Sequence, residues 1–255
     1  MHYKVSGSGT PIVLIHGFCE NSSIWKDLEK ELSDDYQIIS VDLPGFGQSP
    51  LDSSDLTLDH VATMIHDFLK QLKISNCFMI GHSLGGYTIM SFAEKYSDML
   101  LGFGLFHSTT FADSEEKKAI REKGIEHVTH HGMEAFSKGF VPNLFHKDNL
   151  SKFSIEMKIL IKMAAATPIA TFVAYSRAMK NRKDTTKMLS SFKNPIFIIA
   201  GENDNAIPLL QSQQMISKID EKNALLLSET GHMGFIEKKN ESLSFIHSFL
   251  IKNKI

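Results

Sequence analysis

The sequence has few cysteines, little net charge and no long apolar run, and each shortage excludes a class of protein. The two cysteines, Cys19 and Cys77, show no metal-ligand spacing and predict reduced thiols rather than a disulfide framework. A formal net charge of −2 without a basic stripe argues against a nucleic-acid partner. The longest apolar runs, such as residues 196–200, have the length of a strand and are too short to span a bilayer. The N-terminus lacks an apolar signal segment, so we expect a cytoplasmic protein without a membrane partner.

Short apolar runs alternate along the chain with longer helical patterns. The runs are nearly continuous, as in strands covered on both faces, and lie at residues 12–15, 37–41, 77–80, 100–106, 196–200 and 224–227. Helical patterns cover residues 24–32, 58–72, 84–96, 209–219 and 241–252. The alternation predicts the α/β fold class, with a mostly parallel central sheet and helices on both faces.

A long insertion interrupts this alternation between residues 106 and 196. A structureless loop of that length is improbable inside a compact domain, and the sequence instead shows helical patterns. Asp113 begins a capping-box pattern that predicts a helix start, and Gly132 predicts the end of that helix. Thr167, followed by proline, predicts the N-cap of a later helix.

The insertion suggests two parts, a core of residues 1–110 and 186–255 and a helical cap, or lid, of residues 111–185. Ligands favour the carboxyl ends of open parallel sheets. We therefore expect the cap to line the pocket, the alternative being a helical subdomain without a gating role.

Residues 81–85 read Gly-His-Ser-Leu-Gly and match the pattern G-x-S-x-G, which places a serine on a tight strand-to-helix turn. The pattern alone is weak, and an ordinary turn is the alternative. However, an apolar run at 77–80 enters it and a helical pattern at 84–96 leaves it. The flanking glycines relieve crowding, and the helix N-terminus favours negative charge near the serine. These features predict that Ser83 is a nucleophile.

A serine hydroxyl is a weak nucleophile and needs a base in contact with it. His232 lies after the last predicted strand and before the final helix, from where it can reach the carboxyl edge of the sheet. The base in turn needs an anion that fixes its tautomer. Asp204, after the run at 196–200, is the preferred candidate, and Glu202 in the same loop is the alternative.

Acyl transfer also needs two backbone donors aimed at the developing oxyanion. The N–H of Leu84, which follows the nucleophile, offers one, and the N–H of Phe18 offers the other. Three nearby histidines receive other roles. His16 is expected to be a structural hydrogen-bonding group, His82 to point away from its neighbour Ser83, and His107 to pack or to line the pocket.

Together these segments resemble the α/β-hydrolase superfamily over nearly the whole chain. Residues 41–49 resemble the family's D-x-x-G-x-G-x-S turn, in which Asp42 and the glycines fix a loop. The order Ser83, Asp204, His232 is also that of the family. The resemblance is to lidded serine esterases and lactonases. One departure from the family is a bare N-terminus, which we expect to shorten the first strand of the family sheet. A serine at position 83 departs from haloalkane dehalogenases and epoxide hydrolases, which use a carboxylate nucleophile there.

The resemblance implies hydrolysis of a small carboxylic ester through an acyl-enzyme, with no metal and no other cofactor. Alternatives are a lactonase or C–C bond hydrolase with the same triad, a perhydrolase or lyase, and a ligand receptor with little turnover. The expected partner is a small-molecule ester or acyl substrate. Arg177 and Arg182 are candidates for binding a substrate carboxylate, with plain surface placement as the alternative. Apolar residues of the cap region and the His232 loop are candidate substrate-binding residues, namely Phe111, Phe136, Phe140, Met179 and Met233.

Overall fold

The structure, a computed structural model, describes residues 1–51 and 53–255 and contains one seven-stranded sheet. The strand order is β1-β3-β2-β4-β5-β6-β7. Every neighbouring pair is parallel except β1 with β3. The predicted α/β class is therefore confirmed. The strands are β1 (Tyr3–Ser6), β2 (Pro11–Ile15), β3 (Gln37–Val41), β4 (Cys77–His82), β5 (Leu100–Phe106), β6 (Ile196–Gly201) and β7 (Ala224–Leu227).

Strand β1 has no counterpart among the apolar runs of the sequence. Its four residues are all exposed, so no burial pattern marks it. It forms because β3 offers a free edge, on which Tyr3 pairs with Val41 and Ser6 with Ile38 in antiparallel register. With four residues the first strand is short, as expected from the bare N-terminus.

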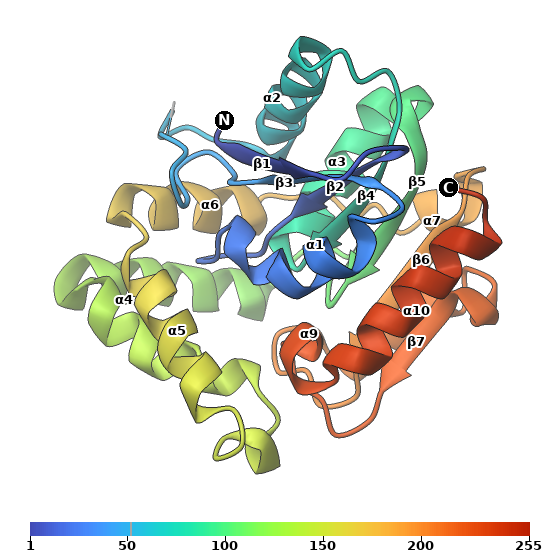
Figure 1. Cartoon of the computed structure of the whole chain (residues 1–255). Helices are drawn as coiled ribbons and strands as arrows, with labels where there is room; N and C mark the ends of the chain where they lie inside the picture. The colour runs from blue at the N-terminus through green and yellow to red at the C-terminus, as the bar shows by residue number, and fades with distance from the viewer. Residues whose placement is uncertain (52) are drawn as a thin grey trace.

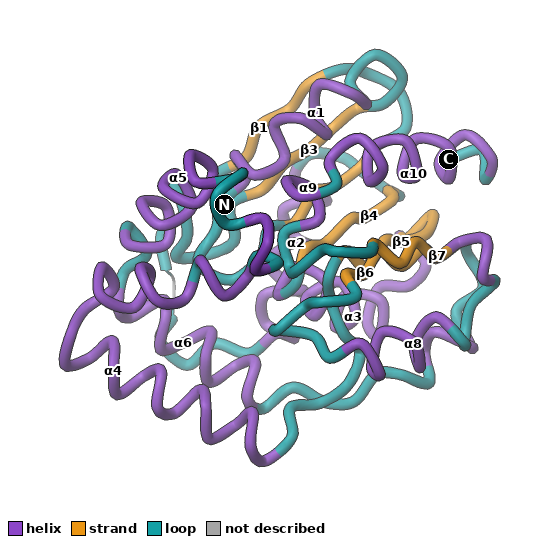
Figure 2. Tube along the Cα trace, turned by 90° about the horizontal axis from the view of Figure 1, so that it is seen from below, coloured by secondary structure: helices purple, strands orange, loops and turns teal. Residues whose placement is uncertain are grey.

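Helices cover both faces of the sheet (Figures 1 and 2). One face carries α1 (Lys26–Leu32) and α10 (Lys239–Lys252), and the other carries α2 (Leu58–Gln71), α3 (Leu84–Tyr96) and α8 (Leu209–Ile216). Alternate side chains of each strand enter the two cores: Leu14 packs in the α1/α10 core and Val13 in the α2/α3 core. Short elements complete the chain, namely α7 (Met188–Ser191), α9 (Gly234–Glu237), η1 (Ser22–Trp25), η2 (Ser97–Met99), η3 (Pro142–Leu144), η4 (Lys147–Asn149) and η5 (Glu221–Asn223).

The insertion between β5 and β6 contains α4 (Glu115–Phe140), α5 (Ser154–Ala165) and α6 (Ile169–Lys180). Figure 1 shows these three helices grouped beside the sheet, away from α10 and the C-terminus. Their apolar side chains form a third core cluster that includes Val128, Leu160 and Phe172. The insertion is therefore packed rather than loosely attached.

Two local predictions in the insertion are wrong, and a third is confirmed. Ser114, not Asp113, caps α4, because its hydroxyl accepts the N–H of Lys117 at 3.2 Å, whereas the Asp113 carboxylate is buried against two arginines. Gly132 ends the first helical stretch, as predicted: its φ of 78° and ψ of 170° are not helical. A second stretch continues directly afterwards to Phe140, and α4 is therefore kinked at Gly132. Pro168, rather than Thr167, is the N-cap of α6.

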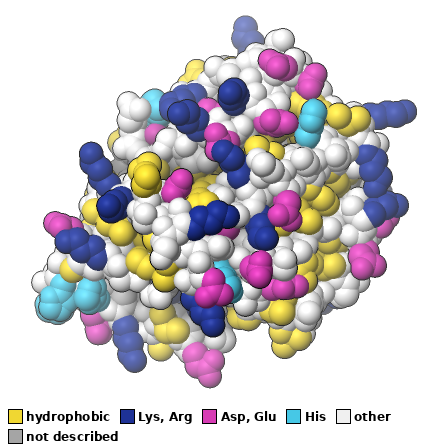
Figure 3. All heavy atoms as spheres, turned by 60° about the horizontal axis from the view of Figure 1, so that its bottom comes forward, with side chains coloured by type: hydrophobic (Ala, Val, Ile, Leu, Met, Phe, Trp, Pro, Cys, Tyr) yellow, Lys and Arg dark blue, Asp and Glu magenta, His cyan; other side chains and the backbone are white. Residues whose placement is uncertain are grey.

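No single described helix combines the length and apolar composition needed to cross a bilayer. Helices α5 and α6 reach that composition only together, and they are bent by 95°. On the face drawn in Figure 3, lysine and arginine side chains are interspersed with aspartate and glutamate. This face therefore has no stripe of one charge.

Candidate active site

Ser83 occupies a sharp turn between β4 and α3. Its φ of 49° and ψ of −111° are unusual for a residue with a side chain and mark local backbone strain. Both flanking positions must be glycine, because a side chain at either one would collide with the backbone. A Cβ at Gly81 would lie 2.4 Å from the carbonyl carbon of Gly85, and one at Gly85 would lie 2.2 Å from a carbonyl oxygen of β2. The turn is held by the N–H of Ser83, which donates to the Phe106 carbonyl at 3.0 Å.

Asp204 and His232 meet at the carboxyl edge of the sheet. Nδ1 of His232 donates to Oδ2 of Asp204 at 2.7 Å, and both side chains are almost completely buried. Oδ1 of Asp204 accepts the backbone N–H groups of Ala206 at 2.7 Å and Ile207 at 2.9 Å. Burial alone would raise the pKa of Asp204, but the charge of His232 and hydrogen bonds from His232 and His107 hold that pKa far below its usual range. Asp204 is therefore an ionised carboxylate, while Glu202 is exposed.

Because Nδ1 of His232 carries the proton of the hydrogen bond to Asp204, Nε2 is the unprotonated nitrogen and can act as a base. Ser83 and His232 line the same cavity. Within residues 1–51 and 53–255, neither the Ser83 hydroxyl nor Nε2 of His232 has a hydrogen-bond partner. Both groups are thus free for each other and for a ligand.

A second histidine shares the Asp204 carboxylate. Nδ1 of His107 donates to Oδ2 of Asp204 at 3.2 Å, and its Nε2 is buried without a partner among the described residues. Burial lowers the pKa of His107 to about 4, although the hydrogen bond to Asp204 acts in the opposite direction. His107 is therefore neutral at pH 7.

The three side chains His107, Asp204 and His232 place possible metal ligands within 4.8 Å of one another. However, both histidines direct Nδ1–H at the same carboxylate oxygen, so these nitrogens have no lone pair for a metal. The three side chains therefore fit a group in which two histidines donate hydrogen bonds to one carboxylate.

A buried ion pair between Glu20 and His82 lies beside Ser83. Nδ1 of His82 donates to Oε2 of Glu20 at 2.9 Å, and Nε2 donates to the His232 carbonyl at 3.0 Å. Since a neutral imidazole has one N–H and both partners are acceptors, His82 is an imidazolium. Burial alone would lower the pKa of His82, but the negative charge of Glu20 outweighs it and raises that pKa.

The same pair reaches the segment that carries Phe18. Oε2 of Glu20 also accepts the N–H of Gly17 at 2.6 Å. A Cβ at Gly17 would lie 2.6 Å from both Oε2 of Glu20 and Nδ1 of His82, so only glycine allows this approach. The sequence gives no signal for Glu20 and predicts of His82 only that it points away from Ser83, whereas both Glu20 and His82 line the cavity at Ser83. The pair therefore connects the segments that carry Gly17, Ser83 and His232.

The two predicted oxyanion donors come from different parts of the fold, one from a loop and one from the start of a helix. Leu84 is the first residue of α3, so its N–H has no acceptor within the helix. The N–H of Phe18 has no hydrogen bond in the described part of the chain, and the Phe18 side chain lines the cavity. Nearby, His16 accepts the N–H of Leu43 at 3.0 Å and donates to the Gly17 carbonyl at 2.8 Å, so it is structural.

The cavity at Ser83 has a volume of about 280 Å³ and lies between the sheet edge and the insertion. Phe136, Phe140 and Met179 line it, together with Phe18 and Phe172. The ring centroids of Phe136 and Phe172 are 4.8 Å apart. Of the remaining predicted wall residues, Phe111 packs against the α2/α3 core and Met233 is fully buried in the cluster of the insertion.

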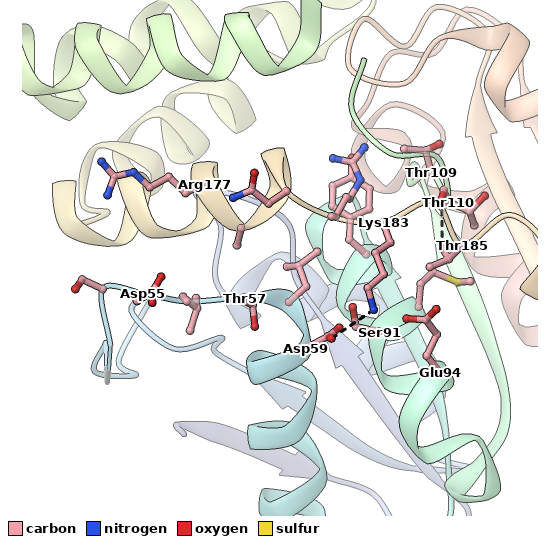
Figure 4. A pocket seen from close by; sticks show the side chains of 18 residues that line it. Asp55, Thr57, Asp59, Ser91, Glu94, Thr109, Thr110, Arg177, Lys183 and Thr185 are labelled. Carbon is pink, nitrogen blue, oxygen red and sulfur yellow. Dashed lines mark hydrogen bonds and ion pairs between the residues drawn. The ribbon is translucent and has the colours of Figure 1, made fainter. Parts of the chain in front are cut away.

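A second cavity, of about 540 Å³, lies between α2, α3 and the end of α6 (Figure 4). Its walls combine polar and apolar side chains, and Lys183 there lies 3.8 Å from Asp59, with which it forms an ion pair. Arg177 and Arg182 line this cavity and not the one at Ser83. Arg182 is engaged with Asp113 at 2.6 Å. The second cavity contains none of the predicted catalytic residues.

Comparison with known proteins supports the fold. A family model described as the alpha/beta hydrolase fold matches residues 10–118. A 2-hydroxy-6-oxo-6-(2'-aminophenyl)hexa-2,4-dienoic acid hydrolase of Metapseudomonas resinovorans is 23% identical over 97% of this chain and 86% of its own.

Solved structures agree along nearly the full length. A thermophilic esterase from Thermogutta terrifontis with malate bound superposes with a TM-score of 0.92 and 26% identity, covering 98% of this chain and 93% of its own. The enol-lactonase from Burkholderia xenovorans LB400 has a TM-score of 0.89 at 20% identity, covering 98% and 96%, and shows the same fold. The sheet topology, the family match over residues 10–118 and these similarities show that the chain has the α/β-hydrolase fold.

Proposed function

We propose that the protein is a serine hydrolase that cleaves a small carboxylic ester through an acyl-enzyme intermediate. One observation carries the proposal: Ser83, on a strained turn, shares a cavity with His232, whose Nδ1 is held 2.7 Å from Asp204. This is the arrangement that activates a serine hydroxyl. The similarity to an esterase supports an ester as the substrate.

The proposed reaction has two halves. Nε2 of His232 takes the Ser83 proton while Oγ attacks the ester carbonyl, and the Phe18 and Leu84 N–H groups bind the oxyanion. Asp204 stabilises the imidazolium that forms, and this imidazolium protonates the leaving alcohol. Water then attacks the acyl-enzyme with His232 again as the base, which releases the acid and restores Ser83.

In this proposal residues 111–185 act as a cap over a core of residues 1–110 and 186–255. The cavity supports such a division, because Ser83, His232 and Phe18 line it from the core and Phe136, Phe172 and others from the insertion. A cap excludes water from the acyl-enzyme and gives the apolar part of a substrate its binding surface.

A second candidate is hydrolysis of a C–C bond or a lactone by the same triad. The relative named for hydrolysis of a hexadienoic acid favours the first of these. Assays with such a dienoic acid and with lactones, beside simple esters, distinguish the three substrate classes. Ligand binding with negligible turnover would instead indicate a receptor.

The direct test is turnover of p-nitrophenyl esters of increasing chain length. We expect Ser83→Ala and His232→Asn to lower kcat by at least about a thousandfold, because each removes a group that acts in the transition state. His247→Asn is the matched control, since His247 lies on α10 outside the cavity. A fluorophosphonate should label Ser83. Labelling of a different serine, or full activity of Ser83→Ala, would contradict the proposal.

A further inference from the structure

The first half of α4 presents a cationic edge to the Ser83 cavity. Lys117, Ile120, Arg121 and Gly124 all line it, and their spacing places them on one face of the helix. The kink at Gly132 lets the second half of α4 line the same cavity with aromatic rings. One helix therefore contributes both a charged wall and an apolar wall.

Most acidic charge around the cavity is already neutralised. Glu20 lines it but is paired with the His82 imidazolium. Asp113 lies behind Arg121 and is shared between two guanidinium groups, those of Arg121 and Arg182. Because the Asp113 carboxylate is shared with Arg182, it does not neutralise the charge of Arg121 in full.

Lys117 adds an ammonium group with no acidic partner among the described residues. Nζ donates to the Ala206 carbonyl at 2.8 Å, a neutral acceptor, which leaves two of its three N–H bonds available. Burial lowers the pKa of Lys117, and the nearby charge of Arg121 lowers it further. A bound anion would relieve this repulsion and complete the hydrogen bonding of the ammonium group.

We propose that Lys117 and Arg121 form a subsite for a carboxylate of the substrate. The preferred substrate is then an ester or lactone that carries a carboxylate on one side and an apolar, preferably aromatic, group on the other. This inference rests on the proposed hydrolase function and names its substrate class. It also replaces Arg177 and Arg182 as candidates, because those side chains line the other cavity.

The first test measures binding without catalysis. The Ser83→Ala protein is titrated calorimetrically with 3-phenylpropanoate and with its neutral isostere 3-phenylpropanamide. We expect the carboxylate to bind about ten- to a hundredfold more tightly, since hydrogen bonds to charged groups are the strong ones. The preference should shrink as salt is raised.

Matched variants locate the source of this preference. Lys117→Met in the same background should lower the ratio of the two affinities about tenfold. Lys123→Met is the control, because Lys123 is an exposed lysine of the same helix with no ion pair in the described residues. Equal binding of the two probes, or a ratio unchanged by Lys117→Met, overturns the inference.

The second test compares turnover within matched pairs, 4-acetoxybutanoate with 4-acetoxybutanamide and monomethyl adipate with methyl adipamate. We expect kcat/KM to favour the carboxylate in at least one pair, with a ratio that falls in Lys117→Met. Turnover that depends on Ser83 but never favours the carboxylate overturns the subsite and leaves the hydrolase. Lys117-dependent binding without any ester turnover supports the subsite and rejects the ester hydrolase.

Discussion

His107→Asn should change how stability depends on pH. His107 is completely buried, its φ is 47°, and its Nδ1 donates to Asp204. Asparagine tolerates a positive φ and can offer an amide N–H near the same position. The substitution therefore removes a titrating ring with limited damage to the triad.

The expected magnitude comes from the two protonation states. The pKa of His107 is about 4 in the folded protein and about 6.5 in an unfolded chain. Between these values the unfolded chain binds a proton that the folded protein does not, so stability rises with pH and is lost as pH falls from about 6.5 to 4. From pH 7.5 to 4.5 this loss amounts to about 2 to 3 kcal/mol.

The measurement is the free energy of unfolding in urea at pH 7.5 and pH 4.5. The drop in stability between these pH values should be about 2 to 3 kcal/mol smaller in His107→Asn than in the wild type. Other titrating groups are common to both proteins and cancel in this comparison. His247→Asn, the same change on α10, should keep the wild-type drop. Equal drops for His107→Asn and the wild type would refute a neutral buried His107.

Three further substitutions test the supports of the site. Glu20→Gln should lower kcat about tenfold or more with little change in KM, and should shift the pH profile of kcat, because His82 then loses the charge that raises its pKa. Gly17→Ala should have a similar effect on kcat and lower Tm by several degrees, since its Cβ would lie 2.6 Å from both members of the pair. Glu237→Gln should cost about 2 to 4 kcal/mol in urea unfolding, because this buried carboxylate accepts three N–H groups. Glu229→Gln, at an exposed position, is its control. Equal stability of the two variants would contradict a stabilising role for the Glu237 carboxylate.

The sheet was predictable because its strands are buried on both faces. Continuous apolar runs such as residues 196–200 leave few alternatives to a covered parallel strand. Strand β1 was missed because all of its residues are exposed. Within the insertion, the helices were recognisable, but the capping role of Asp113 was wrong. Its burial between Arg121 and Arg182 depends on a contact 69 residues away, which no local pattern contains.

The predicted triad came from local motifs and from topology, since each candidate follows a strand whose carboxyl end meets the same edge of the sheet. No sequence motif marks the groups that support the triad. Glu20 lies 62 residues from His82, and His107 lies 97 residues from Asp204. Their partners are decided by how the loops pack after folding. The sequence therefore indicates which groups carry the proposed chemistry better than it indicates which groups hold them.

The loop that carries His232 is fixed from several sides, and this limits how the insertion can move. Asp204 binds its ring, and His82 binds its carbonyl. Glu237 accepts the N–H of Gly231 at 2.8 Å and, from the insertion, the N–H of His146 at 2.8 Å. The N–H of His232 itself donates to the Leu144 carbonyl of the insertion at 2.6 Å. Because a buried carboxylate is costly without its donors, the turn around residues 144–146 must stay in place for the base to stay aligned. The first half of α4 is joined to the same edge of the cavity by a different contact, the hydrogen bond from Lys117 to the Ala206 carbonyl at 2.8 Å.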